Sequence, residues 1–280
     1  MAQPYIKRIL NAQVYDVARE TPLDAAPLLS ARLDNEAFLK REDLQPVFSF
    51  KCRGAYNKMV HLDVAARAAG VVAASAGNHA QGVALAASKL GIKATIVMPV
   101  TTPLIKVDAV KALGAKVLMH GDSFDEAAVR ARALTESEGC TFIHPFDDPD
   151  VIAGQGTAAV ELVRQAQQPL DYVFVCCGGG GLLAGMAASL RYVWPHTRII
   201  GVEPEDAACV QAALEKGRRV TLREVGLFAD GCAVAQVGKE TFRLIRDCVD
   251  DVITVSTDEI CAAVKDIFED TRAIAEPTGA

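Results

Sequence analysis

Tyr172-Val-Phe-Val-Cys-Cys-Gly-Gly-Gly-Gly-Leu182 joins an apolar run to four consecutive glycines, and a helical pattern begins near Leu182. A short apolar run bounded by glycine is typical of a buried strand that turns into a helix. Glycines also leave backbone N–H groups uncovered at the helix N-terminus, where the helix dipole favours an anion such as phosphate. The stretch therefore predicts a strand-turn-helix unit with an anion site at Gly178, Gly179, Gly180 and Gly181. A turn that serves only chain reversal is the plainer alternative.

The same alternation recurs along much of the chain. Short apolar runs occupy 71–74, 94–98, 116–119, 198–202 and 251–255, and helical patterns occupy 53–69, 78–90, 104–113, 124–138 and 151–167. Further towards the N-terminus the spacing predicts a helix over 5–19 and a short extended segment over 33–41. Apolar strands that alternate with helices predict an α/β fold with parallel sheets covered by helices on both faces.

A boundary between two strand-helix series lies at Pro145-Phe-Asp-Asp-Pro149. We therefore expect two α/β lobes with a cleft between them. Ligands of such folds bind beyond the carboxyl ends of the strands, so the strand-to-helix turns are the places to look for chemistry.

Composition excludes several classes of function. The 280 residues carry a net charge of −6 and are 51% hydrophobic, which argues against a nucleic-acid surface. No stretch has the length of a membrane span, and Met1-Ala-Gln-Pro lacks the features of a signal peptide, so we expect a cytoplasmic protein with a small-molecule partner. The eight cysteines show no metal-binding spacing, so we expect reduced thiols and no metal site.

Ser49-Phe-Lys-Cys-Arg-Gly-Ala55 places one lysine, Lys51, among small and apolar neighbours at a predicted helix start. A lysine amine attacks a carbonyl only when it is unprotonated, and partial burial favours that form. Lys51 is therefore a candidate nucleophile, with an ordinary surface lysine as the alternative.

Ser75-Ala-Gly-Asn-His-Ala-Gln-Gly82 follows another apolar run and opens another predicted helix. Small residues here let a carboxylate approach backbone amides, and the Asn78 side chain can cap the helix or bond a ring hydroxyl. An N-capped helix with a tight entry explains the local sequence equally well. His79 is more often a packing histidine than a base at such a position.

A dinucleotide is a rival ligand for the glycine run. Gly179-x-Gly181-x-x-Ala184 fits the permissive G-x-G-x-x-[GA] pattern, and Glu203 ends the next apolar run, where a ribose-binding acid belongs. Taken alone, this pattern indicates an NAD-dependent oxidoreductase.

These motifs, in this order, resemble the serine/threonine dehydratase family of fold-type II pyridoxal-phosphate enzymes. The resemblance runs from about Val14 to Ala280, and it includes Val151-Ile-Ala-Gly-Gln-Gly-Thr157, Val225-Gly-Leu-Phe-Ala-Asp-Gly231 and Ala275-Glu-Pro-Thr-Gly-Ala280. It implies a two-lobed fold like that of the tryptophan synthase β subunit. A large cofactor-binding lobe would comprise 1–52 and 146–280, and a small lobe would comprise 53–145.

The resemblance also implies roles for single residues. Lys51 would hold pyridoxal 5'-phosphate as an imine, Phe50 would pack near its ring, and Asn78 would bond its 3-hydroxyl. The phosphate would lie on Gly178, Gly179, Gly180, Gly181 and Leu182. Ser75, Gly77 and His79 would lie in the loop that receives the substrate carboxylate.

The implied reaction is deamination of L-threonine to 2-oxobutanoate, and less well of L-serine to pyruvate, as the first step of isoleucine biosynthesis, by a homo-oligomer (dimer or tetramer). The family places a serine near the pyridine nitrogen in a strand-loop beyond Ala280, together with a last helix and strand and a regulatory domain. We therefore expect a C-terminally truncated catalytic domain. Alternatives are a serine dehydratase or racemase on the same fold, an NAD-dependent oxidoreductase, and a catalytically impaired fragment.

Overall fold

The computed structural model describes residues 3–280, which divide into two compact units. Unit 1 comprises the described residues up to Leu10 together with Glu20–Asp43 and Gly156–Ala280, and unit 2 comprises Asn11–Arg19 and Leu44–Gln155. The predicted lobes, 1–52 with 146–280 and 53–145, have different limits, and their assignment stays a prediction. Met1 and Ala2, on which part of the signal-peptide expectation rests, lie outside the described residues.

Unit 2 is built on a parallel sheet in the order β5-β4-β3-β6. Its strands are β3 (Val71–Ala74), β4 (Ala94–Met98), β5 (Lys116–Met119) and β6 (Thr141–Phe142). Its helices are α3 (Lys51–Val60), α4 (Val64–Ala69), α5 (Asn78–Leu90), α6 (Leu104–Ala112) and α7 (Phe124–Glu138), and α8 (Pro149–Gln165) crosses the boundary between the units.

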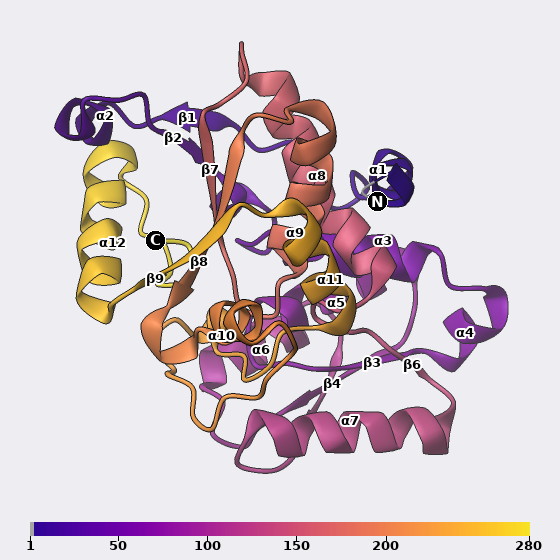
Figure 1. The fold of residues 1–280 in the computed structure, drawn as a ribbon. Coiled ribbons are helices and arrows are strands. Elements are labelled where there is room, and N and C mark those ends of the chain that lie inside the picture. Colours follow the sequence, from indigo (N-terminus) through magenta and orange to yellow (C-terminus); the bar gives the residue numbers. More distant parts are fainter. Residues whose placement is uncertain (1–2) are drawn as a thin grey trace. The chain divides into compact units, whose positions relative to one another are not determined.

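The two faces of this sheet bury different sets of side chains, because successive residues of a strand point to opposite sides. Val71 and Ala73 pack with residues of α3, α5 and α6, whereas Val72 and Ala74 pack with residues of α7. Figure 1 shows α7 on one side of these strands and α5 and α6 on the other. The sheet is therefore buried on both faces, as its apolar strands predict.

Unit 1 contains a second parallel sheet, in the order β7-β8-β9. The strands are β7 (Tyr172–Cys176), β8 (Arg198–Pro204) and β9 (Asp251–Val255), and the helices that follow them along the chain are α9 (Gly181–Val193), α10 (Cys209–Lys216), α11 (Lys239–Cys248) and α12 (Thr257–Thr271). Val173, Val175 and Ile199 point to one face and are buried. On the other face of β7 the rings of Tyr172 and Phe174 stack with centroids 6.0 Å apart and stay largely exposed.

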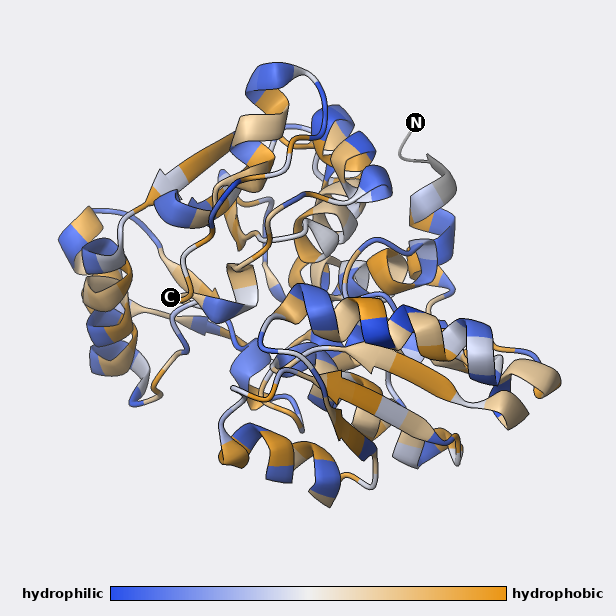
Figure 2. Ribbon diagram, turned by 90° about the horizontal axis from the view of Figure 1, so that it is seen from below, coloured by the Kyte–Doolittle hydropathy of each residue, from blue (hydrophilic) through white to orange (hydrophobic). Residues whose placement is uncertain are grey.

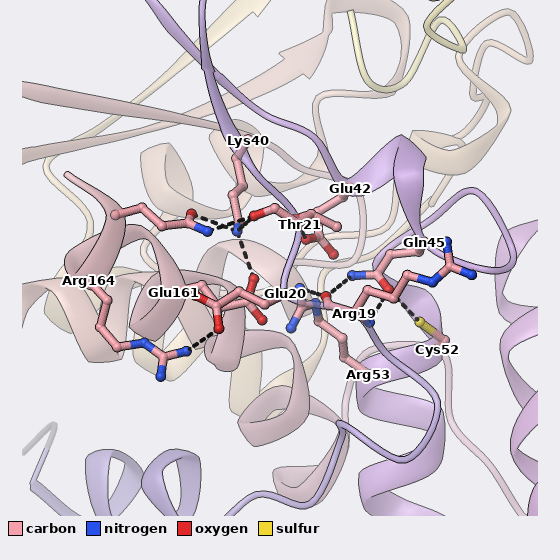
Figure 3. Close-up of polar contacts among 11 residues, drawn as sticks. Arg19, Glu20, Thr21, Lys40, Glu42, Gln45, Cys52, Arg53, Glu161 and Arg164 are labelled. Carbon is pink, nitrogen blue, oxygen red and sulfur yellow. Dashed lines mark hydrogen bonds and ion pairs between the residues drawn. The ribbon is translucent and has the colours of Figure 1, made fainter.

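The N-terminal part of unit 1 adds α1 (Gln3–Leu10), α2 (Pro27–Leu33) and an antiparallel pair, β1 (Leu23–Ala25) with β2 (Phe38–Lys40). Lys40 at the end of β2 fixes this pair to α8. Its Nζ lies 2.7 Å from the fully buried carboxylate of Glu161 and also donates to the Thr21 carbonyl oxygen (Figure 3). Breaking a buried pair of this kind leaves an uncompensated charge, so the contact ties the two segments firmly.

The prediction of an α/β fold with parallel sheets is confirmed. Five of the six predicted apolar runs start and end within one residue of a strand of the structure, and the sixth, 198–202, lies within β8. The helices carry both hydrophobic and hydrophilic residues along their length, as Figure 2 shows. Helices of this kind can bury one side against a sheet and expose the other to water.

Two helix predictions are wrong: one helix ends early, and the other is interrupted. The predicted helix over 5–19 stops at Leu10, and Val14, which follows in a turn, is buried in the core of unit 2 instead. The predicted helix over 53–69 is two helices, because Asp63 caps the second one by accepting a hydrogen bond from Ala66 N. In both segments the apolar residues keep helical spacing past the point where the helix ends, so the spacing alone does not reveal the interruption.

Candidate cofactor site

Lys51 is the first residue of α3 and is half-buried. Its Nζ donates to the main-chain carbonyl of Pro145 at 3.0 Å and lies 5.4 Å from the centroid of the Phe50 ring. Its backbone N–H donates to Ser49 Oγ at 3.3 Å. The ε-amino group is thus held at a helix N-terminus beside an aromatic ring, in the partly apolar setting that the sequence predicts.

Close packing of α3 on α5 fixes the position of the Lys51 backbone. Gly82 of α5 faces it, and a Cβ at that position would lie 2.9 Å from the Lys51 carbonyl oxygen and 3.0 Å from its carbon. Only glycine lets the two helices approach this closely without a shift.

A polar network supports the residues that follow Lys51 on α3. The Gln45 side chain accepts from Arg19 N and donates to Arg19 O, both at 2.9 Å, and Arg53 Nη2 donates to the same carbonyl at 3.2 Å (Figure 3). Arg53 is fully buried. Because Arg53 lies two residues after Lys51 on α3, its bond to the Arg19 carbonyl restricts how far the start of this helix can move.

The turn after β3 brings a second helix N-terminus into unit 2. Ser75 Oγ accepts from Gly77 N at 3.2 Å, and Gly77 precedes α5 without any side-chain cap. A Cβ on Gly77 would find no atom within 4 Å, so the space in front of this glycine is open. Asn78, the first residue of α5, is half-buried. The turn can therefore offer backbone amides and the Asn78 amide to a ligand.

His79 ties this turn to the segment after β6. Its Nε2 donates to the carbonyl of Ile143 at 2.9 Å, two residues before the Pro145 carbonyl that holds Lys51. Burial, with the nearby Lys51 charge, lowers the pKa of His79 to about 3 despite that hydrogen bond. His79 is therefore neutral at ordinary pH and cannot form an ion pair with a carboxylate.

His144 and Pro145 were not singled out as site residues by sequence reasoning. His144 Nδ1 accepts from Phe146 N at 3.2 Å and from Asp147 N at 2.8 Å, which shapes the turn that presents the Pro145 carbonyl. Burial lowers the pKa of His144 to about 4. Pro145 acts through its main chain, and no side-chain pattern signals that.

The glycine turn lies in unit 1, after β7 and at the start of α9. Gly178 to Gly181 are all buried, and Gly180 has φ +90°, a conformation that favours glycine. A Cβ on Gly180 would also lie 2.8 Å from Ile245 and 3.1 Å from Thr241. Among residues 3–280 no acceptor is found for the N–H groups of Gly179, Gly180 and Gly181. Buried amides without acceptors at a helix N-terminus fit a bound phosphate.

Three buried, reduced thiols lie against this turn. The sequence predicts reduced thiols, but not that three of them gather here. Cys209 Sγ and Cys177 Sγ donate to the Gly178 carbonyl at 3.5 and 3.8 Å, and a Cβ on Gly178 would lie 2.9 Å from the Cα of Cys232. Burial raises the pKa of Cys177 well above its usual value, so that thiol stays protonated. Within the described part of the chain no group of three or more His, Cys, Asp or Glu side chains is suited to hold a metal ion.

Glu203 does not serve as a ribose acceptor in this structure. It is fully buried, and its two carboxylate oxygens accept from Val210 N at 2.9 Å and Gln211 N at 2.8 Å, at the N-terminus of α10. Both oxygens are thus engaged in capping a helix. The dinucleotide interpretation depends on Glu203, and capping of α10 explains why an acid stands there.

Unit 2 brings together Lys51, Phe50, Ser75, Gly77, Asn78 and His79, and unit 1 contains Gly178, Gly179, Gly180, Gly181 and Leu182. Each group stands at a helix start. The prediction that the two groups serve one ligand stays a prediction.

Comparison with known proteins gives the class to which this fold and these residues belong. A family model described as pyridoxal-phosphate dependent enzyme matches residues 14–280. The chain therefore belongs to the family of pyridoxal-phosphate dependent enzymes.

Within that family, biosynthetic L-threonine dehydratase of Burkholderia multivorans is 57% identical over 279 residues, covering 99% of this chain and 55% of that protein. The solved structure of the processed form of threonine deaminase isoform 2 from Solanum lycopersicum has a TM-score of 0.97 and 50% identity, covering 99% of this chain and 80% of that one. Maize serine racemase has a TM-score of 0.94 and 35% identity, covering 98% and 84%. The chain spans about half the length of the curated relatives it matches.

The residues present fit the cofactor that this family uses. A half-buried lysine at a helix start suits an aldehyde, and a buried glycine turn whose amides lack acceptors suits a phosphate monoester. Within residues 3–280 no helix has the length and apolar character needed to cross a membrane.

Proposed function

We propose that this chain supplies the catalytic part of a threonine ammonia-lyase, which converts L-threonine to 2-oxobutanoate and ammonia and accepts L-serine less well. The proposal rests above all on Lys51, whose amine is held half-buried against the Pro145 carbonyl at the head of α3. The 57% identity to a biosynthetic L-threonine dehydratase favours threonine as the substrate and isoleucine biosynthesis as the setting.

The residues have the following roles in this proposal. Lys51 would hold the cofactor through its aldehyde, and its free amine would take the proton from the substrate Cα. Phe50 packs near the ring, Asn78 bonds the ring hydroxyl, and the turn from Gly178 to Leu182 binds the phosphate. When bound, the cofactor supplies the electron sink for the charge left at Cα.

Ser75, Gly77 and His79 form the loop that receives the substrate carboxylate. Because His79 is neutral and bonded to Ile143, its part is to hold the loop in place, and the open space at Gly77 admits the carboxylate to the amides of α5. We further propose a homo-oligomer, dimer or tetramer, and a cytoplasmic location.

Turnover of L-threonine and L-serine by the cofactor-loaded protein tests the substrate. One methyl group in an apolar pocket is worth roughly 1 to 3 kcal/mol, so we expect L-threonine to be preferred about 10- to 200-fold in kcat/KM. Formation of D-serine without a keto acid would point to a racemase instead. No product from either amino acid, with cofactor bound, would indicate the catalytically impaired fragment.

A further inference from the structure

We infer that Thr241 is a positioning residue that aims the amides of the glycine turn at the cofactor phosphate. The inference rests on the proposed function, because it assigns a task to a residue that supports the proposed phosphate site. Thr241 acts on the phosphate site indirectly, through its hydrogen bond to the Gly179 carbonyl.

Thr241 lies in the first turn of α11 and is fully buried. Its Oγ1 donates to the Gly179 carbonyl at 2.8 Å, and the backbone N–H of Gly238, which precedes α11, reaches the same oxygen at 3.3 Å. Two donors at the start of α11 therefore fix the direction of the Gly179 carbonyl.

Peptide geometry converts this contact into a direction for an amide. In a planar trans peptide the carbonyl of one residue and the N–H of the next point to opposite sides. Since the Gly179 carbonyl is directed at Thr241, the Gly180 N–H is directed away from α11. That N–H has no acceptor among the residues that the structure describes.

The two flanking peptides are anchored in the same manner. The Gly178 carbonyl accepts from Cys209 Sγ at 3.5 Å, and the Gly180 carbonyl accepts from Ala184 N at 2.9 Å in the first turn of α9. The N–H groups of Gly179 and Gly181 are therefore directed by the carbonyls before them. A thiol is a weak donor, whereas a threonine hydroxyl at 2.8 Å makes a full hydrogen bond, so Thr241 provides the firmer side-chain anchor.

Thr241 also supports the shape of the turn. Gly180 adopts φ +90°, and the side chains of Ile245 and Thr241 pack against the place where a Cβ of Gly180 would be, with Ile245 Cδ1 at 2.8 Å and Thr241 Cβ and Oγ1 both at 3.1 Å. The turn is thus backed by a side chain that both fills volume and donates a hydrogen bond, and these two contributions can be separated by substitution.

The test compares Thr241→Val, which keeps the volume but removes the donor, with Thr241→Ser, which keeps the donor. Affinities for pyridoxal phosphate and for pyridoxal, which lacks the phosphate, are measured by absorbance titration. We expect Thr241→Val to weaken pyridoxal phosphate binding roughly tenfold and to leave pyridoxal binding unchanged, and Thr241→Ser to behave like the wild type. Should Thr241→Val fail to fold, Thr241→Ala takes its place against Thr241→Ser.

Equal weakening of both ligands would assign Thr241 a merely structural role and overturn the inference. So would a Thr241→Val variant that binds pyridoxal phosphate as the wild type does. Binding of inorganic phosphate, followed by phosphorus NMR, separates this inference from the proposed function. If wild-type protein forms no link to pyridoxal phosphate yet binds phosphate in a Thr241-dependent way, the proposed function fails and the inference stands. If it binds neither, both fail.

Discussion

At the residue scale, two neutral histidines surround the acceptor of the Lys51 amine. His79 donates to Ile143 and His144 shapes the turn beyond it, so the Pro145 carbonyl between them has a fixed direction. A protonated imidazole on either side would repel the Lys51 charge. Burial prevents this by keeping both rings neutral.

The buried state of His79 predicts how stability depends on acid. An unfolded histidine takes up a proton near pH 6.5, whereas His79 in the folded chain stays neutral down to about pH 3. Stability is therefore lost as the pH falls through 6.5, and at pH 5 the loss from this residue is about 2 kcal/mol. His79→Gln, which can still donate to Ile143, should reduce the loss between pH 7 and pH 5 in urea unfolding.

The control for this prediction is His196→Gln, because His196 is exposed. That variant replaces a histidine by glutamine without changing the contact with Ile143. If His79→Gln shows the same pH dependence as the wild type, His79 titrates in the folded chain as it does in the unfolded one, and its assignment as a neutral linker is wrong.

Single residues can be put forward as candidates where the chemistry lies in their own neighbourhood in the sequence. Local pattern alone suggests Lys51 and the run from Gly178 to Gly181 as site residues, and their roles stay predictions. Pro145 and Thr241 do not, because each acts on a residue 94 or 62 positions away. Contacts of this kind are set by tertiary packing, and no local pattern records them.

At the scale of elements, the packing of α3 on α5 places the candidate nucleophile. Gly82→Ala adds a Cβ that would meet backbone atoms of Lys51 and Cys52 at 2.9 to 3.1 Å. Backbone cannot step aside as a flexible side chain can, so we expect a loss of about 1 to 3 kcal/mol in the free energy of unfolding. We also expect slower formation of the imine with pyridoxal phosphate.

Ser88→Ala is the matched control, since Ser88 is exposed on the same helix. It should leave both the unfolding free energy and the rate of imine formation near the wild-type values. A Gly82→Ala variant that is as stable and as reactive as this control would show that α3 and α5 do not need their close approach.

The N-terminus of α10 depends on a buried carboxylate whose pKa is raised by burial to about 7. As the pH rises from 4.5 to 7, the unfolded Glu203 ionises while the folded one keeps its proton, so the folded state loses stability over this range. Glu203→Gln cannot ionise. The free energy of unfolding of Glu203→Gln minus that of the wild type should therefore increase between pH 5 and pH 8. A constant difference across that range would show that the pKa of Glu203 is not raised in the folded chain.

The ends of elements were less predictable than their existence. Asp63 interrupts one helical pattern, and the turn around Val14 ends another, because each of these residues finds a partner or a core position that overrides local spacing. The strand β6 is only Thr141–Phe142, too short to produce a pattern. It nevertheless positions the segment that carries Ile143 and Pro145.

At the scale of the whole molecule, both units follow one plan of parallel strands joined by helices. The order of the motifs along the chain sufficed to predict the family, because three spaced motifs are far more specific than one glycine pattern. The limits of the two lobes stay a prediction. A local pattern does not show where the chain passes between units 1 and 2, which it does several times and once within α8.

The assembly state is a prediction at this scale. We expect light scattering of the purified chain to give the mass of a dimer or tetramer of a 29.7 kDa subunit. A monomer at micromolar concentration would contradict the proposed oligomer. It would leave the cofactor chemistry at Lys51 to be judged separately.

Covalent capture of the cofactor tests the central claim most directly. The protein is incubated with pyridoxal phosphate, reduced with borohydride, digested and mapped by mass spectrometry, with Lys51→Ala and the exposed-site variant Lys89→Ala treated alongside. We predict one pyridoxyl group, on Lys51, which is absent in Lys51→Ala and retained in Lys89→Ala. Wild-type protein that acquires no label, or acquires it on other lysines while Lys51 stays unmodified, would contradict the account.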